Sequence, residues 1–217
     1  MLPTTLEAID VHAMVAAKGT DVFAQYTVTI TCPFTRETWT LQKRFSDFRR
    51  LRDAVVRLHR TNRAPCTAIS LQELLAAPFP SKHLLPLRPR VMFERSLLFQ
   101  NFLLKIVEVR NACWRGLSDA PPSANTAKQY VSLIADFLGI YDVPQLGYAH
   151  ASPSIMNEAC AICLDHFQAA ELIDGHKVVQ LPCSHIFHQR CVGQWLRTKK
   201  TCPLCRDPTT QITGLVL

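Results

Sequence analysis

Residues 183-CSHIFHQRC-191 hold two cysteines and two histidines within nine positions, and this stretch decides the fold of the second half of the sequence. The cysteine pair 160-CAIC-163 precedes it and the pair 202-CPLC-205 follows it. Together they offer two sets of four Cys and His side chains, the number that a structural zinc ion takes in a tetrahedron. The two-residue gap within each pair allows a short turn to direct both thiols at one ion. The sequence therefore predicts two zinc ions.

Catalysis by a nucleophilic thiol is the alternative use of such residues. It is disfavoured because no cysteine of this region is left over for it. A nucleophilic Cys needs a free thiolate beside a base, whereas all six cysteines of this region are used as ligands. The region is short and poor in apolar residues, so we expect the metal to supply folding free energy, on the order of 10 kcal/mol or more per ion. His166 remains as a rival ligand and His176 as a surface loop residue. A zinc-stapled scaffold without activity stays a competing interpretation.

The spacing of the eight ligands over residues 160–206 resembles the RING finger in its variant with two central histidines. The resemblance implies a small cross-braced module with two zinc ions. Its first zinc would be held by Cys160, Cys163, His188 and Cys191. Its second zinc would be held by Cys183, His185, Cys202 and Cys205.

The same resemblance implies a surface for a ubiquitin-conjugating enzyme charged with ubiquitin. Ile162, Trp195 and Pro203 match the family's docking groove. Arg206 follows the last ligand, at the family's linchpin position, where a planar fork of donors suits the bridging of two partners. The alternatives are core packing for Trp195 and a solvated charge for Arg206. The implied activity is that of a ligase that positions the ubiquitin thioester for a substrate lysine and forms no covalent intermediate.

The earlier part of the chain carries the positive charge. Residues 1–141 have 18 Lys and Arg against 11 Asp and Glu, which accounts for the whole net charge of +7. A basic surface can meet nucleic acid, an anionic membrane or an acidic protein. The run 49-RRLRDAVVRLHR-60 offers a nucleic-acid patch, but we expect no nucleic-acid partner, because an amphipathic helix already accounts for those arginines.

Periodicity predicts an α+β fold for this basic part. Apolar residues alternate with polar ones over 9–13, 26–30 and 39–41, as in half-buried antiparallel strands. Helical spacing follows from residue 48, over 91–110 and over 128–138. The Pro, Gly and Ser of residues 142–154 suit a linker. We therefore expect a first domain over 1–141, a linker over 142–158, a zinc module over 159–207 and a tail over 208–217.

The stretch 43-KRFSDFRRL-51 resembles the motif at the end of the third strand of phosphoinositide-binding PX domains. The order of strands, Pro-rich loop and helices over about residues 4–141 is similar too, which implies a three-stranded antiparallel sheet with a helical subdomain. The resemblance implies that Arg44 grips the 3-phosphate, Phe45 packs on the inositol ring, Lys82 meets the 1-phosphate and Arg95 contacts the 4- and 5-hydroxyls. This set favours phosphatidylinositol 3-phosphate. Without a ligand, Phe45 would be core, Arg44 and Lys82 solvated, and Arg95 on an exposed helix face.

The loop 82-KHLLPLRPR-90 places leucines beside cations. Leu84, Leu85 and Leu87 flanked by Arg88 and Arg90 suit shallow insertion into an anionic leaflet, although the leucines could instead cap the core. The first proline expected before this loop is replaced by Ala77, which affects the loop geometry and not Lys82.

The remaining signals concern the compartment. No stretch is apolar and long enough to span a bilayer, and Glu7 and Asp10 interrupt what a signal peptide would need. We expect a cytoplasmic location, peripheral on endosomal membranes, with Cys32, Cys66 and Cys113 as buried thiols. The expected function is a membrane-recruited RING ubiquitin ligase, and the alternative is a non-catalytic phosphoinositide-binding adaptor. The apolar tail 211-QITGLVL-217 would pack on the zinc module or form a dimer contact.

Overall fold

The computed structural model describes residues 8–32, 37–61, 68–115, 121–140, 145–173, 177–209 and 211–217. The chain forms two compact units. The first, which we call the PX unit, consists mainly of residues 6–31 and 38–141, and the second, which we call the zinc unit, mainly of residues 142–217. Cys66 and His176 lie outside the described residues, whereas Cys32 and Cys113 are buried and form no disulfide.

The sheet of the PX unit has the three antiparallel strands that the alternating pattern predicts. They are β1 (Ala8–Lys18), β2 (Asp21–Thr31) and β3 (Thr38–Arg44), with β2 in the centre. Val28 of β2 pairs with Val11 of β1 and with Leu41 of β3. Ile9, Val11, Val28 and Ile30 are buried, and the polar residues between them face outward or lie half-buried, which confirms the predicted period of two.

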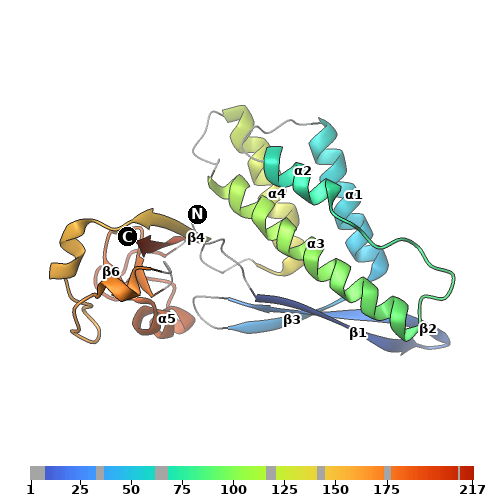
Figure 1. Cartoon of the computed structure of the whole chain (residues 1–217), viewed down its shortest axis with the longest axis horizontal. Helices are drawn as coiled ribbons and strands as arrows, with labels where there is room; N and C mark the ends of the chain where they lie inside the picture. The colour runs from blue at the N-terminus through green and yellow to red at the C-terminus, as the bar shows by residue number, and fades with distance from the viewer. Residues whose placement is uncertain are drawn as a thin grey trace. The chain divides into compact units, whose positions relative to one another are not determined.

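Helices cover one face of this sheet (Figure 1). They are α1 (Phe45–Thr61), α2 (Ala68–Ala76), α3 (Pro89–Arg115) and α4 (Pro121–Leu138). Between sheet and helices lies an aromatic core in which Phe99 stacks on Phe48 at 3.8 Å and meets the edge of Tyr26 at 4.9 Å, measured between ring centroids. Trp39 fastens the sheet to the end of α4, because its indole N–H donates to the Leu138 carbonyl over 2.9 Å. The α+β fold predicted for this unit is confirmed.

The zinc unit is built from short elements around a four-stranded sheet. The strands are β4 (Gln145–His150), β5 (Val178–Gln180), β6 (Ile186–His188) and β7 (Gln211–Val216), in the order β4-β7-β5-β6. The helical elements are the 3-10 turns η3 (Pro153–Asn157) and η4 (Ala169–Glu171) and the helix α5 (Gln189–Thr198).

Strand β4 lies within the segment for which the sequence predicts a linker. It pairs in parallel with β7, so that Gln145 meets Gln211 and His150 meets Val216. Gly147 permits close approach at this point, since a Cβ there would lie 3.2 Å from the Gln211 side-chain nitrogen. The Pro, Gly and Ser content of the segment is a local signal, and it carries no information about a strand partner so distant in sequence.

The apolar tail is expected from the sequence either to pack on the zinc module or to form a dimer contact. In the structure it forms strand β7 and packs on the zinc unit. Ile212, Leu215 and Val216 are buried, and the Leu217 N–H donates to the Leu172 carbonyl over 3.2 Å. The tail therefore adds to an apolar core of this unit that also contains Phe167, Phe187 and Leu196. In the part of the chain that the structure describes, no helix has the length and apolar character needed to cross a bilayer.

Candidate functional site

The zinc unit gathers the eight predicted ligands into two groups. One holds Cys160, Cys163, His188 and Cys191, and the other Cys183, His185, Cys202 and Cys205. Within each group the ligand atoms all lie within 4.8 Å of one another. The groups interleave along the chain, which is the cross-braced grouping that the resemblance implies. His166, the rival ligand, is exposed and belongs to neither group.

Two turns of the same geometry present the outer cysteine pairs. In the first, the Leu164 N–H donates to the Cys160 carbonyl over 2.7 Å, and Leu164 has a φ of 67°. In the second, the Arg206 N–H donates to the Cys202 carbonyl over 3.0 Å, and Arg206 has a φ of 63°. These left-handed residues are uncommon for side chains other than glycine, and they close each turn so that both of its thiols face the same point.

Two thiols of the first group, those of Cys160 and Cys191, have pKa values that are shifted in opposite directions. Burial raises the pKa of Cys160, but the backbone N–H groups around it, from Cys163, His188 and Ile162, outweigh burial and bring the pKa to about 7. Burial and the neighbouring thiols of Cys163 and Cys160 raise the pKa of Cys191 to about 11. The backbone N–H groups thus stabilise the thiolate of Cys160, whereas burial and the neighbouring thiols disfavour the thiolate of Cys191.

The two histidines turn the same ring nitrogen toward the sulfurs. His188 Nδ1 lies 3.3 Å from Cys163 Sγ, and His185 Nδ1 lies 3.3 Å from Cys183 Sγ. Each group thus offers three sulfurs and one imidazole nitrogen, a donor set that structural zinc takes. The residues present fit that metal.

Apolar side chains around these groups are exposed. Ile162 is 43% and Trp195 39% exposed, and Pro203 is half-buried. Trp195 is thus partly covered and partly open to a partner, and its indole N–H donates to the Thr201 carbonyl over 2.8 Å. Leu164 and Leu204 are also exposed and were not singled out from the sequence, although each stands within or directly after a cysteine pair. Arg206 is exposed on the second turn.

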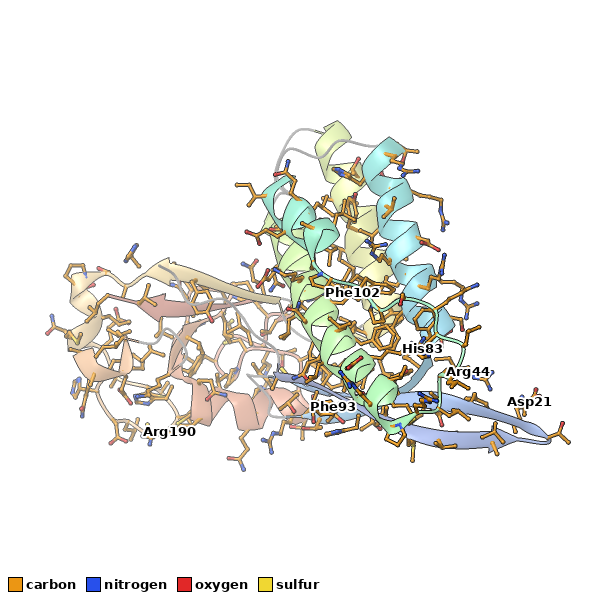
Figure 2. All side chains as sticks on the ribbon, turned by 45° about the vertical axis from the view of Figure 1, so that its right-hand side comes forward. Asp21, Arg44, His83, Phe93, Phe102 and Arg190 are labelled. Carbon is orange, nitrogen blue, oxygen red and sulfur yellow. The ribbon has the colours of Figure 1, made fainter. Side chains whose placement is uncertain are left out.

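In the PX unit, Arg44 ends β3 where the sheet meets α1 (Figure 2). Its guanidinium carbon lies 3.4 Å from the ring centroid of Phe23, a cation–π contact that holds an otherwise exposed side chain. Its backbone N–H donates to the Asp47 carboxylate over 2.6 Å. The same carboxylate pairs with Arg50. Arg44 is thus held by its backbone N–H and by its ring contact, and Asp47 forms its ion pair with Arg50.

Arg95 of α3 joins the other predicted lipid residues. Its guanidinium carbon lies 4.5 Å from the ring centroid of Phe45, and its Nη2 donates to the Ser81 carbonyl over 2.8 Å. It is only 5% exposed, so the exposed helix face considered from the sequence is wrong. The structure brings Arg95 to Phe45 and to the residue before Lys82, while Lys82 itself is exposed.

The three leucines of the Pro-rich loop differ in their surroundings. Leu84 is 98% and Leu85 48% exposed. Leu87 is half-buried and lines a cavity of about 390 Å³ between β1 and α3, together with Val11, Met92 and others. The most exposed apolar side chains of this loop are therefore Leu84 and Leu85, while Leu87 is partly covered.

Comparisons with known proteins match both units. The family model described as PX domain matches residues 32–113, and the one described as Ring finger domain matches residues 158–206. The E3 ubiquitin-protein ligase RNF13 of Homo sapiens is 47% identical over 58 residues, which are 26% of this chain and 14% of that protein. The E3 ubiquitin-protein ligase arkadia of Xenopus tropicalis is 50% identical over 56 residues, which are 25% of this chain and 5% of that protein.

The shared part is therefore a small fraction of these relatives. The E3 ubiquitin-protein ligase RING1-like of Arabidopsis thaliana repeats the pattern, with 47% identity over 53 residues, 24% of this chain and 14% of its own length. The match over residues 158–206 encloses both four-ligand groups, and the match over 32–113 encloses Arg44, Phe45 and Arg95. The chain therefore carries a PX domain followed by a RING-type finger.

Proposed function

We propose that this protein is a RING-type ubiquitin ligase that its PX domain recruits to membranes. The observation that carries the proposal is the exposure of Ile162 and Trp195 beside the two ligand groups. Leu164 and Leu204, which stand at the same cysteine pairs, are exposed as well, and a set of exposed apolar side chains gathered at one feature is typical of a partner-binding surface. The relatives that share this region are named E3 ubiquitin-protein ligases.

The roles follow from the chemistry of each side chain. Two zinc ions, when bound to the two ligand groups, would fix the turns that carry the docking residues. Ile162, Trp195 and Pro203 would contact the conjugating enzyme, and Arg206 would donate to both the enzyme and its ubiquitin. Catalysis would consist of holding the thioester in one orientation for a substrate lysine. The six cysteines serve as ligands, so the ubiquitin would pass directly from the conjugating enzyme.

The PX domain would target the protein to a membrane. Arg44 would hold the 3-phosphate of phosphatidylinositol 3-phosphate through a charge-assisted contact, with Phe45 against the ring and Lys82 on the 1-phosphate. Arg95 would reach the ring hydroxyls from its place over Phe45. Leu84 and Leu85 would enter the leaflet, as exposed apolar side chains next to cations do. We infer a peripheral, endosomal location on the cytoplasmic side.

Autoubiquitination by the purified full chain, against a panel of conjugating enzymes, tests the ligase. We expect chains with at least one enzyme, and we expect Ile162→Ala and Arg206→Ala to reduce their rate about tenfold or more, because each removes a contact made in the positioned state. Ile173→Ala is the matched control, since Ile173 is 70% exposed in the same unit and lies outside the docking set.

The adaptor alternative predicts a different result. If no enzyme yields chains while the sample holds two zinc ions, the zinc unit binds partners without activating ubiquitin transfer. If Ile173→Ala slows the reaction as much as Ile162→Ala, the docking surface is not the one that we propose.

A further inference from the structure

Glu171 stands outside both ligand groups and yet touches one of them. Its Oε2 atom lies 3.1 Å from His188 Nε2, while His188 Nδ1 faces the Cys163 sulfur at 3.3 Å. The His188 side chain is 2% and the Glu171 side chain 23% exposed. The imidazole is therefore enclosed between a cysteine cluster on one edge and a carboxylate on the other.

The local chain holds this carboxylate in place. Glu171 ends the turn η4, and its Oε2 also accepts the backbone N–H of Gln168 over 3.1 Å. The Glu171 N–H in turn donates to the Gln168 carbonyl over 2.9 Å. On the other side, the Phe167 ring packs edge-on against the His188 ring, with 5.0 Å between centroids. The carboxylate therefore has two hydrogen-bond partners, and the imidazole is packed against a ring as well as against the carboxylate.

The chemistry of imidazole gives this contact a consequence. A neutral ring carries its proton on one nitrogen and can offer a lone pair only from the other. A carboxylate at Nε2 keeps the proton there and leaves the lone pair of Nδ1 directed at the sulfurs. We propose that Glu171 is a positioning residue for the metal ligand His188, and that it strengthens metal binding at the first site.

The second ligand group differs in the burial of its histidine and in the contacts of the Nε2 atom of that histidine. His185 Nδ1 lies 3.3 Å from Cys183 Sγ and 3.6 Å from Cys202 Sγ, but its ring is only half-buried. Among the described residues, no carboxylate is paired with its Nε2 atom. Cys205 of this site is exposed. The structure therefore assigns the two sites unequal affinities, with the first site holding its ion more tightly.

Competition with a chromophoric zinc chelator tests the inference on the full chain loaded with two zinc ions. We expect two steps of release in the wild type. Glu171→Ala should weaken the tighter ion by about 10- to 100-fold and leave the weaker ion unchanged. Glu171→Gln should have an effect near the lower end of that range, because an amide oxygen still accepts from both N–H groups but carries no charge. Glu158→Gln, at an exposed Glu of the same unit, is the matched control.

Two spectra separate positioning from a general loss of structure. In the zinc-loaded protein, the ¹⁵N shifts of His188 should show the proton on Nε2. With ¹¹³Cd in place of zinc, Glu171→Gln should move one of two cadmium signals. If the variants leave both affinities unchanged, or weaken both sites equally, Glu171 does not position His188. Should Glu171→Ala fail to fold, Glu171→Gln decides, since it keeps the acceptor that closes η4. No ubiquitin assay enters this test, so its failure is distinct from failure of the proposed ligase.

Discussion

The two units of this chain reach a defined fold by different means. The PX unit encloses an apolar core around Tyr26, Phe48, Phe99 and Phe102, all at most 2% exposed. The zinc unit combines two clusters of thiols and imidazoles with buried apolar side chains, among them Phe167, Phe187 and Leu196. In the first unit, hydrophobic burial is the main source of stability. In the second, we expect metal binding to share that role.

This difference determines where function can be altered without loss of the fold. In the PX unit, the proposed lipid residues Arg44 and Lys82 are exposed and lie outside the core, whereas Arg95 is buried. In the zinc unit, the ligands and the fold are one set, because Cys160 and Cys202 are fully buried as well as proposed to bind metal. Substitutions at Arg44 or Lys82 should therefore separate lipid binding from stability, whereas substitutions at the metal ligands should not separate metal binding from stability.

Metal removal should give the largest effect and should be confined to one unit. A strong chelator should unfold the zinc unit, with a loss on the order of 10 kcal/mol per ion, while the PX unit keeps its structure. Two-dimensional amide NMR spectra of the full chain would show collapse of the signals from 145–217 and dispersed signals from 8–140. Restored signals after zinc is added back would exclude irreversible damage. Loss of both sets of signals would contradict the conclusion that only the zinc unit depends on metal for its fold.

A core truncation should give the reverse pattern. Phe99→Ala should destabilise the PX unit by about 3–5 kcal/mol, because it empties a site packed against Phe48 and Tyr26. Urea unfolding followed by helical circular dichroism would measure the loss, and zinc content should stay at two ions per chain. Phe93→Ala is the control on the same helix, since Phe93 is 64% exposed, and its cost should stay within about 0.5 kcal/mol. Equal costs for the two variants would contradict the placement of the core.

The smallest effect on stability should come from Arg44. Arg44→Ala removes a cation–π contact at the surface and should cost about 0.5–1 kcal/mol of unfolding free energy. It should weaken binding to vesicles that contain phosphatidylinositol 3-phosphate by about 10- to 100-fold, as loss of a charge-assisted contact would. Co-sedimentation with such vesicles measures this change. The control Arg49→Ala removes the same charge from α1 and should leave binding nearly intact. In the structure the Nε atom of Arg49 lies 3.9 Å from Oδ2 of Asp53. A similar loss in both variants would indicate attraction by net charge alone.

Patterns repeated along the chain made most of the fold predictable. Alternation located β1, β2 and β3, and helical spacing located α1, α3 and α4, although α3 begins before residue 91 and α4 begins at Pro121. Ligand spacing selected the eight side chains that the structure groups in fours. Each of these patterns involves residues that lie close together along the chain, so it can be recognised in a single sequence.

Features that depend on distant partners were not predictable in this way. The pairing of β4 with β7 leaves no local trace, and nothing near Glu171 in the sequence points to His188. The burial of Arg95 had a usable signal, because residue 95 lies one helical turn before the buried Phe99 and therefore on the same face of α3. The alternative of a solvated Arg95 followed from its charge alone, whereas in the structure this side chain lies over Phe45 and donates to the Ser81 carbonyl.

The parallel pairing of β4 and β7 has a mechanical consequence. The two strands flank the zinc finger along the chain, and Gln145 is aligned with Gln211 at one end while His150 is aligned with Val216 at the other. Tension applied between residues 145 and 216 would load this ladder in shear, so that its hydrogen bonds share the force instead of opening one after another. The ligand groups lie between the strands in sequence and would carry little of that load. In a pulling experiment, the zinc finger should therefore yield only after the two strands have separated.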